Sequence, residues 1–332
     1  MPKIIPASPS AIREAARILR DGGIVAFPTE TVYGLGANAL NADAVARIFA
    51  AKGRPATNPV IVHIARLSAL AEVALVSPAA QTLAASFWPG PLTMVLPKTG
   101  RVPDIVTAGG ETVGVRMPRH PVAQELIREA DLPIAAPSAN RSEQISPTRA
   151  EHVALSLGDN VDLILDGGPC EVGIESTVLD LVSDRPRILR PGMITAAQIE
   201  AALGIALYSG PASAAGKARS PGQRPRHYAP HTPVLIADTA EIVARASAPA
   251  CSDAYLVFSP DAAIATSERP QFLTSADPAT YAAHLYAALH KLDKLPGIAC
   301  IVVERLPGGA DWDAIRDRLK RAATPPAAGA GV

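Results

Sequence analysis

Several features that mark common protein classes are scarce in this 332-residue chain. It has three cysteines, Cys170, Cys251 and Cys300, which form no Cys-x-x-Cys pair, so the sequence supports neither a zinc site nor a disulfide framework. No run of 18 apolar residues occurs, and the first ten residues, MPKIIPASPS, lack the apolar segment of a signal peptide. We therefore expect a cytoplasmic protein that makes no membrane contact.

An excess of charge of one sign is also missing, because 31 Lys and Arg residues balance 31 Asp and Glu residues. Proteins that bind nucleic acids over a broad surface usually carry a basic excess. A site for a polyanion must therefore be a local cluster of Lys and Arg. Aromatic residues make up only 4% of the chain while 48% is apolar, which indicates a globular α/β protein with a core of Ala, Val, Ile and Leu.

Apolar segments of strand length alternate with helical patterns up to about residue 208. One helix is predicted over residues 10–20, ended by Gly22, and another begins after Asn41 as its N-cap and ends at Lys52. Strands are predicted at 23–27, 60–64, 93–96, 113–116, 163–165, 178–181 and 187–189, the last two joined as a hairpin. This pattern predicts an α/β domain over residues 1–208, in which helices flank a twisted mixed sheet.

The composition changes after residue 208. Residues 209–232 are rich in proline and glycine and lack periodicity, so we expect a linker. Beyond it, predicted strands at 234–236, 255–258 and 301–303 alternate with predicted helices at 240–246, 280–292 and 312–322. This alternation predicts a small βαβ-type, Rossmann-like domain over residues 233–323, followed by a disordered tail at 324–332.

Two glycine patterns imitate nucleotide-binding motifs. Gly34-Leu-Gly36-Ala-Asn-Ala39 matches a loose GxGxxA pattern, but the region about 20 positions later is basic and lacks the acidic residue that would hold a ribose. We interpret these glycines as part of a tight turn. Residues 210–218 imitate a P-loop, but the glycine spacing is one residue too long and Ala218 has no hydroxyl, so we assign them to the linker.

Four polar stretches interrupt the apolar pattern near strand ends, where α/β proteins bind ligands. They cover residues 28–34, 52–59, 116–120 and 137–140, the last extended by 146–148. Lys52 and Arg54 stand on a loop stiffened by Pro55, and an ammonium beside a guanidinium suits a phosphate group. Taken alone, each candidate has an ordinary structural explanation, because such cations also end helices, Ser and Asn also form turns, and His63 also suits a core.

Together these stretches resemble the YrdC-like threonylcarbamoyl-AMP synthase family, in its long, two-domain form. The resemblance covers residues 5–231 and is weaker beyond them. It rests on Pro28-Thr-Glu-Thr-Val-Tyr-Gly-Leu-Gly36, Lys52-x-Arg-Pro-x-x-Asn-Pro59, Phe87-Trp-Pro-Gly-Pro-Leu-Thr93, Val115-Arg-Met-Pro118, Pro137-Ser-Ala-Asn140, Glu175-Ser-Thr-Val178, Arg190-Pro-Gly192 and Ser220-Pro-Gly-x-x-x-x-His-Tyr-Ala-Pro230.

The resemblance implies an enzyme, a nucleotidyltransferase that makes threonylcarbamoyl-AMP from L-threonine, bicarbonate and ATP for the modification of tRNA. It also implies a downstream transferase complex and tRNA as indirect partners. Nucleotide chemistry predicts Mg²⁺ on the ATP phosphates, and the sequence offers no carboxylate cage that would add a metal ligand from the protein. The resemblance also implies that the linker folds over the active site, with Tyr228 as an exposed residue near the nucleotide.

The resemblance assigns roles to particular residues. The set around phosphate and bicarbonate would be Lys52, Arg54, Ser138 and Asn140. ATP would be held by Arg54, Asn58, the Val115 backbone, Asn140, Thr148, Arg190 and Tyr228. L-threonine would be surrounded by Thr31, His63, Arg119, Ser138 and Thr177, with Arg119 as the partner of its carboxylate.

Two other functions stay open. One is a module that binds double-stranded RNA or tRNA without catalysis, against which the zero net charge and the Ser/Asn/Thr set argue. The other is a carbamoyltransferase that uses carbamoyl phosphate and shares a YrdC-like domain, but those proteins are longer and carry paired zinc cysteines. Release of pyrophosphate from ATP in the presence of threonine would discriminate the synthase from the RNA-binding module.

Overall fold

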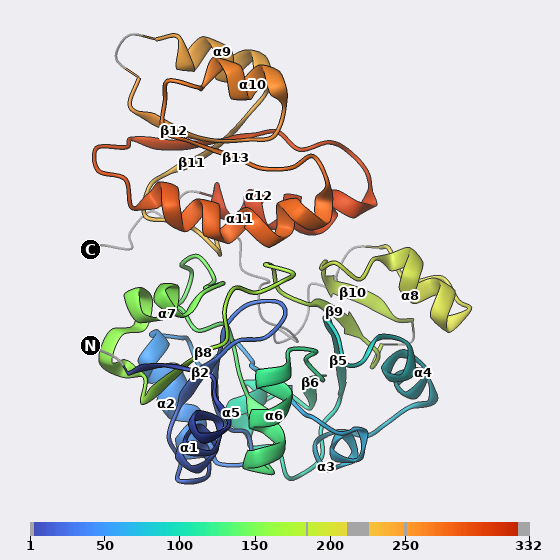
Figure 1. Cartoon of the computed structure of the whole chain (residues 1–332). Coiled ribbons are helices and arrows are strands. Elements are labelled where there is room, and N and C mark those ends of the chain that lie inside the picture. Colours follow the sequence, from blue (N-terminus) through green and yellow to red (C-terminus); the bar gives the residue numbers. More distant parts are fainter. Residues whose placement is uncertain (1–2, 184, 211–225, 249–250, 325–332) are drawn as a thin grey trace. The chain divides into compact units, whose positions relative to one another are not determined.

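The computed structural model describes residues 3–183, 185–210, 226–248 and 251–324. It consists of two compact units: a large unit of residues 1–142 and 147–223, and a small unit of residues 143–146 and 224–332. Each unit contains its own β-sheet (Figure 1). Among the helices in the described ranges, none combines the length and the apolar character needed to cross a membrane.

The large unit is built on a ten-stranded sheet with the order β1-β8-β2-β3-β7-β4-β6-β5-β9-β10. Parallel pairs such as β4–β6 and β5–β9 alternate with antiparallel pairs such as β2–β3 and β5–β6, which confirms the predicted mixed sheet. The strands are β1 Ile4–Pro6, β2 Val25–Phe27, β3 Gly34–Asn38, β4 Ile61–His63, β5 Leu92–Pro97, β6 Thr112–Arg116, β7 Ile134–Ala135, β8 Leu163–Asp166, β9 Thr177–Asp180 and β10 Arg187–Arg190.

Helices cover both faces of this sheet, because strand residues point alternately to opposite sides. Around β2, Val25 and Phe27 pack with α1 and α6, whereas Ile24 and Ala26 pack with α2 and α7. Strands buried on both faces read as continuous apolar runs, as this one does. The helices of the unit are α1 Pro9–Arg20, α2 Ala42–Lys52, α3 Leu70–Val73, α4 Pro78–Phe87, α5 Asp104–Thr107, α6 Pro121–Ala130, α7 Ala150–Leu157 and α8 Ala196–Leu203, with short 3-10 turns at Leu67–Ala69 and Gly158–Asn160.

The tight turn predicted for residues 34–39 is wrong, because this segment is strand β3, paired with both β2 and β7. Glycine is needed there for packing rather than for turning. A Cβ atom on Gly36 would lie 2.7 Å from the ring of Phe27 and 2.8 Å from Ile134. The helix predictions nearby are confirmed: Ser8 caps α1, Gly22 follows its end with a φ of +83°, and Asn41 caps α2.

The small unit contains a four-stranded, fully parallel sheet with the order β11-β14-β12-β13. Helices α9 and α10 cover one face and α11 and α12 the other (Figure 1). The predicted βαβ alternation is confirmed, and the sequence reading missed only β13 and α10. The elements are β11 Val234–Ala237, α9 Thr239–Ala246, β12 Asp253–Val257, α10 Pro260–Ala265, β13 Gln271–Leu273, α11 Pro278–Asp293, β14 Cys300–Glu304, a 3-10 turn at Ala310–Trp312 and α12 Asp313–Ala322.

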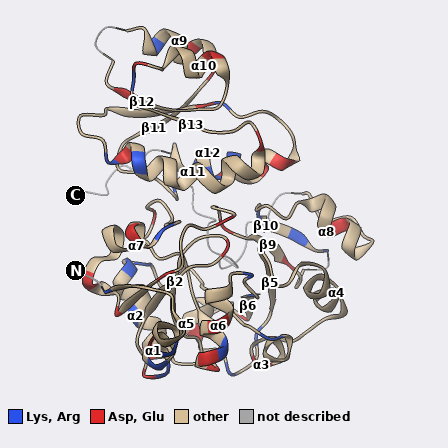
Figure 2. Cartoon of the chain, in the orientation of Figure 1, with Lys and Arg blue, Asp and Glu red and all other residues tan. Residues whose placement is uncertain are grey.

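Basic and acidic positions are interspersed along the elements of both units (Figure 2), in keeping with the zero net charge of the chain. Most of the predicted linker, residues 211–225, lies outside the described residues, and so does nearly all of the P-loop-like segment at 210–218. The tail predicted to be disordered lies outside them from residue 325 onward.

The end of the linker is part of the small unit, and Tyr228 is buried there with 1% of its surface exposed. Its ring lies 5.3 Å from the guanidinium carbon of Arg318 and 5.8 Å from the ring of Tyr286. The next residue, Ala229, donates its amide to the carbonyl of Glu143 at 2.9 Å. The expectation that Tyr228 is an exposed linker residue is therefore wrong.

Replacement of Tyr228 should destabilise the small unit. Truncating a buried aromatic side chain to alanine typically costs about 3–5 kcal/mol, and Tyr228→Ala also removes the cation–π partner of the buried Arg318. Tyr208→Ala, at a side chain that is 41% exposed, is the matched control and should stay within about 0.5 kcal/mol of the parent. Urea unfolding followed by Trp312 fluorescence in a Trp88→Phe background measures both; equal stability of the two variants would contradict the packing described.

Candidate active site

Lys52 lies at the end of α2 with only 3% of its surface exposed. Its Nζ donates to the carbonyl of Ser138 at 2.5 Å and to the carbonyl of Asn140. Burial, and after it the positive charge of Arg54, lowers the pKa of Lys52 well below its ordinary value. Lys52 is therefore not a solvated cation at a helix end, because its buried ammonium is hydrogen-bonded to the Pro137–Asn140 loop.

Arg54 is 9% exposed, and we call Lys52 and Arg54 together the cation cluster. Gly53 ends α2 in the left-handed conformation, with a φ of +58°. The chain turns at this residue, and the Arg54 side chain reaches the loop residues that follow it. The guanidinium then donates from Nε to the carbonyl of Asn58 at 3.0 Å and from Nη2 to the carbonyl of Pro59 at 2.6 Å. These bonds to carbonyls hold the Arg54 guanidinium in the loop that follows Lys52.

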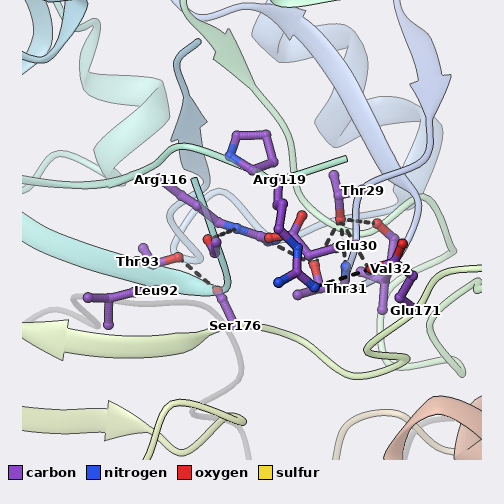
Figure 3. A network of polar contacts seen from close by, with 12 residues as sticks. Thr29, Glu30, Thr31, Val32, Leu92, Thr93, Arg116, Arg119, Glu171 and Ser176 are labelled. Atoms are coloured by element: carbon purple, nitrogen blue, oxygen red, sulfur yellow. Dashed lines mark hydrogen bonds and ion pairs between the residues drawn. The ribbon is translucent and has the colours of Figure 1, made fainter. Parts of the chain in front are cut away.

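A second cluster, the Thr31 cluster, consists of Glu30, Thr31 and Arg116 and is almost fully buried (Figure 3). Glu30 and Thr31 lie in the loop that follows strand β2. Arg116, the last residue of β6, donates from Nη1 to the hydroxyl of Thr31 at 2.8 Å. Its Nη2 forms an ion pair of 2.7 Å with the carboxylate of Glu30. Burial opposes ionisation of Glu30, but the charge of Arg116 and hydrogen bonding outweigh it and lower the pKa of this carboxyl.

The polar contacts continue from Arg116 to Arg190. Arg116 Nε donates to the carbonyl of Gly90 at 3.3 Å, three residues before Thr93. The Thr93 and Ser176 hydroxyls are 2.8 Å apart (Figure 3), and Arg190 donates to the carbonyl and hydroxyl oxygens of Ser176. A proposed threonine residue, Thr31, is thus connected to a proposed ATP residue, Arg190.

The two clusters are joined by backbone hydrogen bonds within the large unit. Ala139 donates its amide to the carbonyl of Tyr33 at 2.8 Å, and Tyr33 donates its own to the carbonyl of Pro147. Ser138, which is half-buried, forms an isolated bridge with Gly34. The loop that Lys52 binds and the loop that carries Thr31 are therefore hydrogen-bonded neighbours.

His63 is 4% exposed at the end of β4, opposite Arg116 in the parallel ladder. Burial, reinforced by the charge of Arg116, lowers the pKa of His63 to about 3. Its imidazole is therefore neutral at physiological pH. Within the described part of the chain, His63 Nδ1 has no hydrogen-bond partner.

The remaining candidates also lie in the large unit, with one exception. The hydroxyl of the buried Thr177 donates to the carbonyl of Ile194 at 2.7 Å, and the buried Thr148 hydroxyl has no hydrogen-bond partner among the described residues. Arg119, by contrast, is exposed and forms an ion pair of 3.2 Å with Glu171. The other candidates are Asn58 and Asn140, both buried, and Val115 within β6; Tyr228 alone belongs to the small unit.

The sequence reading missed two central residues, Glu30 and Arg116. Both stand inside motifs that carried the resemblance, but neither was given a role. The available signal was an acidic residue three positions after a buried apolar strand, since a buried acid is seldom found without a cationic partner. Only the fold brings Arg116, 86 residues away along the chain, to this carboxylate.

Loss of the Lys52 ammonium should affect both stability and catalysis. Lys52→Met preserves most of the side-chain volume but leaves two buried carbonyls unsatisfied, at a cost of about 1–3 kcal/mol each. Loss of one donor at a developing charge typically lowers a rate by about 100–1,000-fold. Lys3→Met, at an exposed lysine, serves as the control in urea unfolding and in an assay of pyrophosphate release. Near-parental rates and stability for Lys52→Met would disprove both roles.

The depressed pKa of His63 predicts a specific pH dependence. The unfolded chain binds a proton below pH 6.5 whereas the folded chain does so only near pH 3, so the stability from neutral His63 is complete above pH 6.5 and falls as the pH drops toward 3. The stability advantage of the parent over His63→Gln should therefore shrink by about 2 kcal/mol between pH 7.5 and pH 5. Urea unfolding at both pH values tests this, and a constant difference would show that folding does not lower the pKa of His63.

Comparison with known proteins agrees with this geometry. Residues 17–192 match the Sua5/YciO/YrdC family, described as "Telomere recombination", and residues 194–324 match the family described as "Threonylcarbamoyl-AMP synthase, C-terminal domain". The threonylcarbamoyl-AMP synthase of Bacillus subtilis is 45% identical over 94% of this chain and 92% of its own length. That of Pyrococcus abyssi is 50% identical over 68% of each chain.

The fold comparison gives the same result over nearly the whole chain. The crystal structure of P. abyssi Sua5 complexed with L-threonine superposes with a TM-score of 0.86 and 39% identity, covering 97% of both chains. A P. abyssi Sua5 variant with a His and a Tyr replaced by Ala superposes with a TM-score of 0.87 at the same identity, covering 97% of this chain and 96% of that one. The geometry and both comparisons show that this chain belongs to the threonylcarbamoyl-AMP synthase family, in its two-domain form.

Proposed function

We propose that this chain converts L-threonine, bicarbonate and ATP to threonylcarbamoyl-AMP and pyrophosphate. The observation that carries the proposal is that two chemically different clusters lie on loops that are hydrogen-bonded to each other. Lys52 and Arg54 provide buried positive charge, and Thr31 and His63 provide neutral polar groups for a small amino acid. The relative from P. abyssi that binds L-threonine supports the choice of amino acid.

The reaction requires positioning and charge neutralisation rather than a nucleophile from the protein. The neutral amine of threonine captures CO₂ derived from bicarbonate and loses a proton, which gives a carbamate. A carbamate oxygen then attacks the α-phosphorus of ATP, and pyrophosphate leaves with the electrons of the broken P–O bond. Holding two reactants in line in this way lowers the barrier chiefly through orientation and electrostatic stabilisation.

The cation cluster suits the phosphate side of this reaction. The guanidinium of Arg54 and the ammonium of Lys52 would stabilise charge on the α-phosphate and on the departing pyrophosphate. An arriving anion favours the charged form of Lys52, whose pKa burial has lowered. Asn58, Asn140, Thr148, Arg190 and the Val115 backbone would complete the ATP site, and Ser138 with Asn140 would border bicarbonate.

The Thr31 cluster suits the amino-acid side. The exposed guanidinium of Arg119 can exchange Glu171 for the substrate carboxylate, because an exposed ion pair is weak. Thr177 keeps a free acceptor position, since its own proton is donated to Ile194. His63, held neutral, can bind the substrate amine without repelling it or protonating it.

Mg²⁺ is the cation that nucleotide chemistry implies, and it would neutralise charge on the ATP phosphates. The described residues contain no group of three or more His, Cys, Asp or Glu side chains placed to hold a metal ion. We infer that Mg²⁺ arrives with ATP and is coordinated chiefly by phosphate oxygens. Lys52 and Arg54 then bind the remaining phosphate charge directly.

Closure of the site by the linker, with Tyr228 near the nucleotide, stays a prediction, and so does a cytoplasmic location. A closed site would exclude water and protect the mixed anhydride from hydrolysis. The product would then serve a transferase that modifies tRNA, without direct binding of tRNA by this chain. The named relatives support the synthase and neither the RNA-binding module nor the carbamoyltransferase.

Mass spectrometry of the products tests the proposal directly. The protein is incubated with ATP, Mg²⁺, bicarbonate and one amino acid, and the adenylate and pyrophosphate are quantified. A threonylcarbamoyl adduct of AMP that requires both threonine and bicarbonate supports the synthase. Pyrophosphate release without the adduct, or no reaction at all, contradicts it.

The amino-acid pocket predicts a graded specificity. Serine lacks one methyl group, a difference of about 1–3 kcal/mol, so it should react more slowly but still detectably. Valine and allothreonine should also be poorer substrates than threonine, because valine lacks the hydroxyl and allothreonine misplaces it. Competition experiments with pairs of amino acids measure the ratios of kcat/KM, and equal use of glycine would refute a pocket that reads both groups.

A further inference from the structure

Glu304 is a buried acid in the small unit that has no part in the reaction proposed above. It is the last residue of β14 and is 2% exposed. Among the described residues, all of its hydrogen-bond partners are neutral groups. Because an acidic side chain is seldom buried without a cationic partner, the surroundings of this carboxylate must stabilise it in another way.

Four donors on the loops that follow β11 and β12 surround the carboxylate. The amides of Phe258 and Ser259 donate to Glu304 Oε2 at 2.8 and 3.0 Å. The hydroxyls of Thr239 and Ser259 donate to Oε1 at 3.0 and 2.5 Å. Each oxygen thus accepts two hydrogen bonds, which fills the acceptor capacity of a carboxylate. Glu304 therefore has no acceptor position left for a ligand.

The carboxylate lies at the edge of the sheet where open α/β proteins bind ligands. Strand β14 pairs in parallel with β11 and with β12, and Glu304 is opposite Ala237, the last residue of β11. Strands β11 and β12 continue into α9 and α10 on one face of the sheet, whereas β14 continues into α12 on the other (Figure 1). Ligands of open α/β sheets bind beyond the carboxyl ends of the strands, at such a change of direction.

Backbone amides that converge on one point, together with hydroxyls, are the donors that bind phosphate and carboxylate groups in proteins. The donors around Glu304 are of this kind. We propose that they form an anion site of the small unit and that the carboxylate of Glu304 is its built-in ligand. The small unit then takes no phosphate or carboxylate group from outside at this edge, and the binding of ATP is left to the large unit.

Trp312 can report on this site from within the small unit. Its ring lies 6.2 Å from the ring of Phe258 and 5.6 Å from the ring of Tyr281. Burial, and after it the charge of Glu304, raises the pKa of the Tyr281 hydroxyl, so this ring also lies near the carboxylate. In a Trp88→Phe background, Trp312 is the only tryptophan of the chain, and its fluorescence follows the unfolding of the small unit.

Chemical rescue of Glu304→Ala tests the proposal in the full-length chain. The substitution removes one methylene group and the carboxylate, which together have the size of an acetate ion. We expect the thermal transition reported by Trp312 to fall by about 5–10 °C. Sodium acetate at about 0.1 M should restore about half of this loss, compared with sodium chloride at the same concentration, because acetate binds the folded state only.

Glu268→Ala is the matched control, because it removes an exposed carboxylate from the same unit. In this variant and in the parent the site is already occupied by Glu304, so acetate should change the transition no more than chloride does. An equal effect of acetate on all three proteins overturns the proposal, and so does the absence of any effect on Glu304→Ala.

Glu304→Gln keeps the test decisive if Glu304→Ala does not fold. Glutamine has nearly the same shape but replaces one acceptor oxygen by an amino group, which then faces two other donors. We expect its transition to fall by about 5 °C, and acetate not to restore it, because the side chain still fills the site. A Glu304→Gln variant that is as stable as the parent, or one that acetate restores, overturns the proposal.

Discussion

The buried ion pair between Glu30 and Arg116 is the interaction on which the arrangement around Thr31 depends. Through one guanidinium, Arg116 connects the loop after β2, the end of β6 and the segment before β5, which are far apart in sequence. Removal of one member of such a pair leaves a buried charge and typically costs about 3–5 kcal/mol. The same charges also affect His63, since Arg116 opposes protonation of its imidazole and Glu30 only partly compensates.

The cation cluster follows a different principle. Lys52 and Arg54 are buried, yet the bonds of Lys52 Nζ and of Arg54 Nε and Nη2 go to backbone carbonyls rather than to carboxylates. Carbonyls orient a cation and satisfy its donors, but they leave its formal charge in place. The large unit thus contains one buried arginine that is paired with an acid, and two basic side chains, Lys52 and Arg54, whose bonds described above go to backbone carbonyls.

The small unit has a hydrophobic core of its own around a parallel sheet, and it includes residues from two parts of the chain. Residues 143–146 follow the Pro137–Asn140 loop directly, and Ala229 is hydrogen-bonded to Glu143. Tyr228 packs on Arg318 and Tyr286 in the same unit. Residues 143–146 are therefore part of the small unit's own packing.

The sequence by itself determined the local structure and the type of chemistry. Its periodicity predicted α2 with its Asn41 cap, the β9–β10 hairpin and the mixed sheet, because these depend on neighbours in the chain. Its motifs predicted Lys52, Arg54 and Thr31 as site residues. Only the tertiary structure decided that the segment at 34–39 is a strand, that Lys52 and Tyr228 are buried, and that Arg116 reaches Glu30 and Thr31. Burial and charge pairing depend on contacts between residues distant in sequence, which no local pattern encodes.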